Sequence, residues 1–121
     1  MATDYGPGVN VSLATTAAAV GQYKIVKGSS TGVLHGTTTN ETLMGVAQES
    51  VDSAGGTISV CVQGPSKFVA GGTIHIGDSL TSGAAGVAIA TSTGGQRIVG
   101  FSLREAVIGD VFDGIVQPGS L

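Results

Sequence analysis

Apolar and polar residues alternate near the start of the chain, and this period of two is typical of an extended strand. Val9, Val11 and Leu13 hold the apolar positions, and the residues between them are polar. The Ala-rich stretch at 14–20 has neither a capping residue nor a polar face, so a helix is not expected there. We therefore interpret residues 1–20 as an extended N-terminal arm, of a kind that commonly lies on a neighbouring subunit.

Beyond Gly21 the pattern predicts β-structure almost throughout. Apolar and small polar residues alternate at 57–62, and Gly64 with Pro65 is expected to end that strand, because proline cannot donate to a β-ladder. Further short strands, each bounded by turn residues, are expected at 23–27, 32–35, 43–50, 67–69, 73–76, 86–90, 98–103 and 111–116. No window has the spacing of an amphipathic helix. The sequence predicts an all-β, small β-barrel-like domain of short strands over residues 21–121.

Two parts of the chain resemble each other. Met44–Ala47 has the pattern of Val99–Ser102, and the segments that follow them also match in order. Residues 23–64 and 77–119 are therefore interpreted as an internal duplication, which would build one sheet from two similar halves. Coincidence between two stretches rich in Gly and Val is the alternative.

The composition indicates what type of protein adopts this fold. With 121 residues the chain has room for one domain, and 41% hydrophobic residues are enough for a core. Aromatic residues make up 4% and Trp is absent, so we expect a core of Val, Ile, Leu and Ala. Only 11% of the residues are charged, against about 25% in an ordinary soluble domain. Such a surface favours an oligomer over a Thr/Ser-rich monomer, because neighbouring chains would cover part of it.

Charge and cysteine content argue against several functions. The net charge is −3 and the five Lys and Arg residues are scattered, so no nucleic-acid interface is expected. We expect no membrane span and no signal peptide, because no apolar run is long enough and the first residues lack a basic region. Cys61 is the single cysteine and is expected to be a packed thiol in a chain assembled in a reducing cytoplasm. No metal site and no cofactor is expected, since no zinc, calcium or phosphate-loop pattern is present.

One motif suggests catalysis. Gly77–Leu80 spells the signature of the GDSL esterases and lipases, in which the serine is the nucleophile. That chemistry needs a base within reach of the hydroxyl, and in that family the histidine follows the serine. Here His35 and His75 both precede Ser79. We therefore interpret the motif as a turn and expect no catalytic residue and no enzyme activity.

The remaining titratable residues fit structural roles. Asp110 follows a glycine just as Asp78 does, so these carboxylates are interpreted as caps of a repeated turn and not, with Glu105 and Asp113, as an acid/base pair. The two histidines are expected to be surface or interface residues.

A set of short segments occurs in an order that resembles a known family. The segments are Gly45–Ala47, Ala54–Val60, Gln63–Gly64, Ala70–Ile74, Gly77–Leu80, Gly86–Ala88, Ile98–Gly100 and Ala106–Phe112. Together they resemble the capsid decoration proteins, also called cement or head-stabilising proteins, of tailed bacteriophages. The resemblance covers about residues 21–116 and consists of turn glycines and strand valines, whose order and spacing carry it. This chain departs from the family pattern at Ser102 and Leu103, where the family usually has two small residues. It also departs at Gly55–Gly56, where the family has a glycine followed by a charged residue.

The resemblance implies a structural virion protein, made in the cytoplasm of the host bacterium. It implies a homotrimer on the outer surface of the capsid, at threefold and quasi-threefold positions. Its partner would be a major capsid protein of the HK97-like fold, whose subunits it would bridge to stabilise the expanded head. On this basis we expect Val9, Val11 and Leu13 to contact the capsid or an adjacent protomer.

Two other functions are kept as alternatives. The first is a carbohydrate-binding or adhesion module of a phage fibre, for which two Tyr, three Phe and no Trp provide few aromatic surfaces. The second is a small hydrolase built on Ser79.

Overall fold

The fold consists of short antiparallel strands. The computed structural model describes residues 9–14, 20–29, 32–37, 41–50 and 57–120. Its elements are β1 (Val9–Ala14), β2 (Ile25–Ser29), β3 (Gly32–His35), β4 (Leu43–Ala47), β5 (Thr57–Val69), β6 (Ser79–Ser82), the 3₁₀ helix η1 (Ala84–Gly86), β7 (Ala88–Thr91), β8 (Arg97–Ser102) and β9 (Val111–Ser120). The strands form one curled sheet, which confirms the predicted all-β, barrel-like domain. Among the described residues, the helical structure is too short to cross a membrane.

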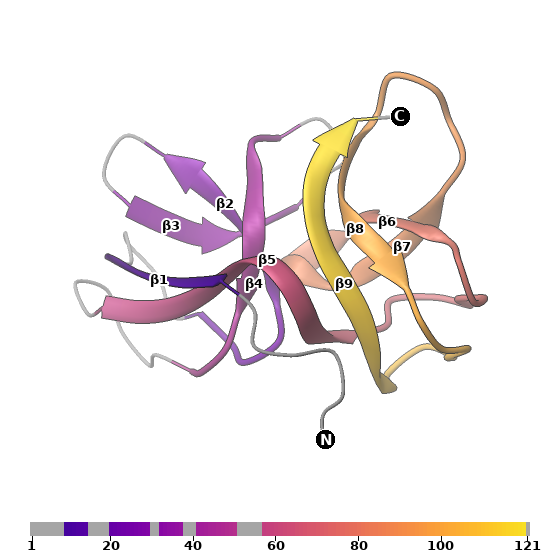
Figure 1. The fold of residues 1–121 in the computed structure, drawn as a ribbon, viewed down its shortest axis with the longest axis horizontal. Coiled ribbons are helices and arrows are strands. Elements are labelled where there is room, and N and C mark those ends of the chain that lie inside the picture. Colours follow the sequence, from indigo (N-terminus) through magenta and orange to yellow (C-terminus); the bar gives the residue numbers. More distant parts are fainter. Residues whose placement is uncertain (1–8, 15–19, 30–31, 38–40, 51–56, 121) are drawn as a thin grey trace.

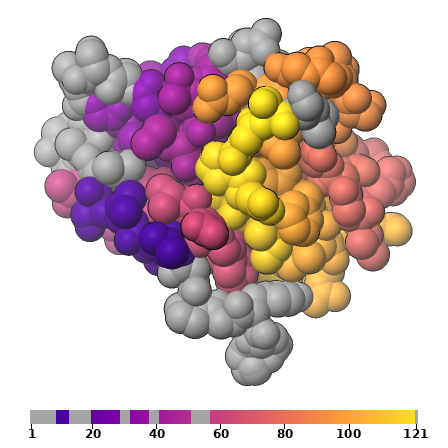
Figure 2. Space-filling model, turned by 45° about the horizontal axis from the view of Figure 1, so that its top comes forward, coloured from indigo at the N-terminus to yellow at the C-terminus, as the bar shows by residue number. Residues whose placement is uncertain are grey.

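The sheet has two halves with the same plan. Its order is β3-β2-β4-β5-β9-β8-β6-β7, with β1 added to β5. In the first half, β2 pairs with β3 and with β4, and β4 pairs with β5. In the second half, β6 pairs with β7 and with β8, and β8 pairs with β9. Figure 1 shows β5 and β9 at the centre, with β2–β4 on one side and β6–β8 on the other. In Figure 2, β9 runs over the surface between the two halves. The repeated topology supports the interpretation of a duplicated strand unit.

The two halves also begin in the same way. The backbone N–H of Tyr23 donates to the carbonyl of Ala47 over 2.7 Å, and that of Gly77 donates to the carbonyl of Ser102 over 2.9 Å. Both donors have a positive φ, +62° for Tyr23 and +87° for Gly77. Each residue ends a turn that leads into the first strand of its half, so the duplication extends to the backbone conformation.

One expected strand is absent and another is longer than predicted. Residues 73–76 do not form a strand, because 75–78 make a tight turn and only Ile74 pairs, in an isolated bridge with Ala106. The strand predicted at 57–62 does not end at Pro65, since β5 runs on to Val69. At Gly64, where φ is +106°, β5 changes partner from β1 and β4 to β9. Proline is tolerated where a strand bends and changes partner. The segment predicted at 67–69 is thus the end of β5, and the other strands are shifted by a few residues.

The core is built around a pair of aromatic rings, which the predicted core of Val, Ile, Leu and Ala did not include. Phe68 and Phe112 face each other across the β5–β9 pair, with ring centroids 5.7 Å apart. Both are buried, and Gly114 leaves room for them, since a β-carbon there would lie 2.7 Å from the Phe68 ring. Two apolar clusters lie on opposite faces of β5 where Val60 and Cys61 are both buried.

Candidate functional site

The motif Gly77–Leu80 forms a turn followed by a strand. The backbone N–H of His75 donates to the Asp78 carboxylate over 2.8 Å, and Gly77 takes the positive φ that the turn requires. Ser79 then begins β6, and Leu80 is fully buried. The turn predicted from the sequence is confirmed in these contacts.

A second turn of the same kind lies beside the first. The backbone N–H of Val107 donates to the Asp110 carboxylate over 3.0 Å, and Gly109 has a φ of +91°. The two turns are held together by two backbone hydrogen bonds between Ile74 and Ala106, of 2.9 and 3.0 Å. They also have the same sequence ending, Ile-Gly-Asp, and in each the isoleucine is exposed.

Both turns carry exposed apolar side chains. They are Ile76 in the first turn, Val107 and Ile108 in the second, and Val111 just after it. Ile76 and Ile108 are the most open, with 66% and 74% of their surface exposed. Between the turns lies a shallow hollow of ≈ 220 Å³, whose wall includes His75, Glu105 and Asp110.

The residues predicted to make contacts in the arm lie on β1. This strand pairs antiparallel with β5 of its own chain, so that Leu13 stands opposite Ile58. Val9 and Val11 are exposed, and Val9 has 53% of its surface open. Residues 1–8 and 15–19 of the expected arm lie outside the described residues. A contact of β1 with the capsid or with another protomer stays a prediction.

A charged cluster lies near the centre of the sheet. Asp113 on β9 accepts from the Lys67 ammonium on β5 over 3.0 Å and lies 3.6 Å from the Arg104 guanidinium. The hydrogen bond from Lys67 lowers the pKa of Asp113, burial opposes that shift, and the charges of Lys67 and Arg104 add to it. Tyr23 and Ser66 share with this cluster the wall of a second hollow, of ≈ 240 Å³.

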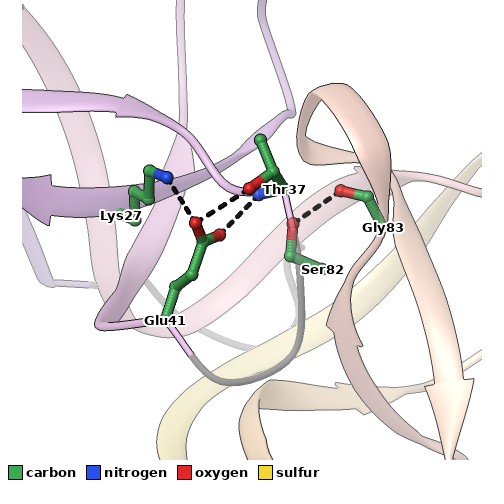
Figure 3. A network of polar contacts seen from close by, with 5 residues as sticks. All are labelled: Lys27, Thr37, Glu41, Ser82 and Gly83. Carbon is green, nitrogen blue, oxygen red and sulfur yellow. Dashed lines mark hydrogen bonds and ion pairs between the residues drawn. The ribbon is translucent and has the colours of Figure 1, made fainter.

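A second polar network lies where the two halves meet. The Lys27 ammonium binds the Glu41 carboxylate, which also accepts from the backbone N–H and the hydroxyl of Thr37 over 2.6 and 2.8 Å (Figure 3). Beside it, the Ser82 hydroxyl donates to the carbonyl of Gly83 over 2.9 Å. The contacts of Glu41 join the segment between β3 and β4 to β2, whereas the Ser82 bond stays at the end of β6; both have a structural role.

The contacts of His35 and Cys61 fit structural roles. Nε2 of His35 accepts from the backbone N–H of Gly21 over 2.9 Å. Burial lowers the pKa of His35, and the positive charge of Lys24 lowers it further. Burial raises the pKa of the Cys61 thiol, and that residue packs in the core, as the sequence predicted. Within the described ranges, no group of three or more His, Cys, Asp or Glu side chains is placed to hold a metal ion.

The chain was compared with known proteins. No family model and no curated protein matches it. Among solved structures, it is similar to the N base of the head fibre gp8.5 of bacteriophage phi29, with a TM-score of 0.72 and 23% identity. The match covers 93% of this chain and 98% of that one. At this identity the likeness shows the fold, which the two chains share over nearly their whole length.

Sequence analysis did not identify the exposed isoleucines of the two turns. The repeated Gly-Asp pair was recognised, but only as turn geometry. The usable signal was the residue before each pair: Ile76 and Ile108 occupy a position where a turn accepts almost any residue.

Proposed function

We propose that this chain is a structural protein of a bacteriophage head, which binds the outer surface of the capsid as a homotrimer. In this role it bridges major capsid subunits and stabilises the expanded head without catalysing a reaction. The likeness to the base of a phage head fibre carries the proposal, because that likeness spans nearly the whole of both chains. The order of motifs that resembles capsid decoration proteins supports the same class of protein.

The exposed edge of β1 supports a contact between protomers. Its six residues, Val9–Ala14, include neither a charged residue nor a proline. Natural proteins protect edge strands with such residues, because an open edge pairs with other chains. Val9 and Val11 add exposed apolar surface to this edge. An unprotected edge of this composition is expected to be covered in the assembled protein, by another protomer or by the shell.

Burial of surface in the assembled protein also explains the low charge of the chain. A protomer with 11% charged residues would be poorly soluble with its whole surface open, whereas a trimer seated on a shell covers much of it. Many identical weak contacts, repeated over an icosahedral surface, then give strong attachment in total. Preferential binding to the expanded shell stabilises that form by mass action.

Three of the described aromatic residues, Phe68, Phe112 and Tyr23, favour this function over binding of carbohydrate. Phe68 and Phe112 are stacked inside the core, so neither offers a face to a sugar ring. Tyr23 is half-buried at the wall of the ≈ 240 Å³ hollow, next to Lys67 and Asp113, whose charges pair with each other. A sugar platform normally needs an exposed aromatic face.

Co-sedimentation tests the proposal. Purified protein is mixed with expanded heads assembled without it, and the bound amount is measured against protein concentration. Saturable binding with a fixed copy number per shell is expected, together with a trimeric mass from light scattering of the free protein. A monomer that stays in the supernatant at every concentration would contradict the proposal. A glycan array with the same protein separates the adhesion alternative.

A further inference from the structure

The two halves of the sheet provide an internal comparison for the charged cluster. β1 pairs with the first part of β5 in the same register in which the last part of β5 pairs with β9. Ser12 opposite Ser59 therefore corresponds to Lys67 opposite Asp113, and the pairing of β4 and β8 with these strands agrees with this correspondence. One strand pair forms with two serines and the other with two opposite charges. Pairing thus does not require the charges of Lys67 and Asp113, which leaves them free for another contact.

Tyr23 is held in a backbone conformation that does not suit its side chain. Its φ of +62° lies in the left-handed region, which is costly for a residue with a β-carbon. The corresponding residue of the second half is Gly77, whose N–H makes the same kind of hydrogen bond to the neighbouring strand. Glycine would therefore form this turn more easily than tyrosine does. Strained residues of this kind cluster at binding sites.

The ≈ 240 Å³ hollow brings this tyrosine together with the charged cluster. The Tyr23 ring packs against the core and contributes to the wall of the hollow, beside Gln48 of the first half. The opposite wall includes Ser66, Lys67 and Asp113 on β5 and β9, the central strands in Figure 1. The Gln48 amide donates to the Ser66 hydroxyl over 2.9 Å and so joins the two walls. The hollow therefore lies at the junction of the two halves.

The charged cluster carries more positive than negative charge. One oxygen of the Asp113 carboxylate accepts from the Lys67 ammonium over 3.0 Å, and the other lies 3.6 Å from the Arg104 guanidinium. Two cations thus share one carboxylate. An ammonium has three donors, and within the described residues Lys67 uses one of them, in the bond to Asp113. A second carboxylate beside Lys67 would balance the charge and add a charge-assisted hydrogen bond.

The charge of the chain favours a second copy of itself as the source of that carboxylate. The sequence has 8 acidic residues and 5 basic ones, so each copy has carboxylates to spare. In the part of the chain that the structure describes, Asp78, Glu105 and Asp110 have no ion-pair partner. In a cyclic trimer each contact joins two different surfaces, so a cationic surface of one protomer faces another surface of the next. An acidic surface there is electrostatically complementary.

We propose that the ≈ 240 Å³ hollow is a contact site of the homotrimer, in which Lys67 binds a carboxylate side chain of the neighbouring protomer. Arg104 neutralises Asp113, which leaves the charge of Lys67 for the neighbour. The Tyr23 ring provides part of the surface on which the neighbouring side chain rests. This inference rests on the proposed function and adds to it the surface and the chemistry of the contact between protomers.

Removal of one charge tests the site through the mass of the protein in light scattering, measured against protein concentration. K67M keeps a long side chain without its charge, and its trimer should dissociate at a concentration about tenfold higher than the unchanged trimer does. Added salt should weaken the unchanged trimer and have less effect on K67M. R97M is the matched control, because it removes the same charge opposite Ser120, at the other end of β9 from Asp113.

A second variant tests the role of the tyrosine. Y23G gives the first turn the residue that forms the corresponding turn at Gly77. The sheet should therefore form, while loss of the ring should weaken the trimer. Circular dichroism checks that the variant folds. If Y23G does not fold, K67M and its control decide the question.

The outcomes separate this inference from the proposed function. A weaker trimer in K67M and Y23G, with R97M unaffected, supports the contact site. An unaltered trimer in both variants overturns it and leaves the proposed function intact, and an equal loss in R97M overturns it because net charge alone would then matter. An unaltered trimer of K67M that no longer binds shells also overturns it, because the carboxylate would then belong to the shell. If the unchanged protein is a monomer at every concentration, the proposed homotrimer fails and this inference fails with it.

Discussion

Gly45 and Gly100 meet the same obstacle in the two halves of the sheet. A β-carbon on Gly45 would lie 2.1 Å from the carbonyl oxygen of Cys61, and one on Gly100 would lie 1.8 Å from that of Ile115. In both places the obstacle is the backbone of the neighbouring strand, which cannot move aside as a flexible side chain can. The duplicated unit therefore depends on close approach of two strands at a glycine, once in each half.

Either glycine replaced by alanine should destabilise the fold. We expect G45A and G100A each to lower the free energy of unfolding by about 3 kcal/mol, because the neighbouring strand must be displaced. Urea denaturation followed by circular dichroism measures the change. G94A is the matched control, since nothing lies within 4 Å of a β-carbon at Gly94. Equal stability of G100A and G94A would contradict the close approach.

The aromatic pair should dominate the stability of the core. F68A is expected to lower the free energy of unfolding by about 4 kcal/mol, because it leaves a cavity beside Phe112. F68L fills most of that space and should cost about 1.5 kcal/mol or less. Thermal unfolding of the two variants gives the comparison. A similar loss in both would mean that the ring itself, and not its volume, is what the core requires.

Stability should depend on pH through His35. Its pKa is lower in the folded chain than in the unfolded one, so the unfolded state binds more protons in the interval between the two values. The stabilisation is therefore complete above about pH 6.5 and decreases as the pH falls through that interval. Protonation also removes the acceptor for the Gly21 N–H. Unfolding measured from neutral to mildly acidic pH should show this decrease, and H35Q should show less of it; the same slope in H35Q would exclude His35 as its source.

Substitutions on β1 should affect assembly more than folding. V9S/V11S changes two exposed side chains, so we expect an unchanged melting temperature and a lower proportion of trimer in light scattering. Deletion of residues 1–13 should weaken assembly too, but it also removes the β1–β5 pairing and should lower stability. A trimer that persists in both variants would remove β1 from the protomer interface.

Ser79 is expected to have a structural role only. Its turn and strand are formed by the backbone of Gly77 and by the Asp78 carboxylate, so S79A should keep the fold and the melting temperature. Hydrolysis of short-chain ester substrates by both proteins tests the alternative. Activity that the unchanged protein has and S79A loses would support a hydrolase and contradict the structural role.

Local chemistry made some features predictable and left others hidden. The turn at Gly77–Asp78 and its repeat at Gly109–Asp110 followed from residues that determine turns wherever they occur. The prediction of a strand at 73–76 was wrong, because an alternating pattern of four residues does not distinguish a strand from a turn. The continuation of β5 past Pro65 depends on pairing with β9, more than forty residues away, which no local pattern contains. Similarly, the two turns lie beside each other only because the Ile74–Ala106 bridge joins segments that are distant in the sequence.

Electron cryo-microscopy of heads assembled without this chain and then incubated with it tests the central claim most directly. We predict new density on the outer surface at the threefold and quasi-threefold positions, with three lobes that each accommodate the curled sheet. Heads that gain no density, or gain it only away from these positions, would contradict the account.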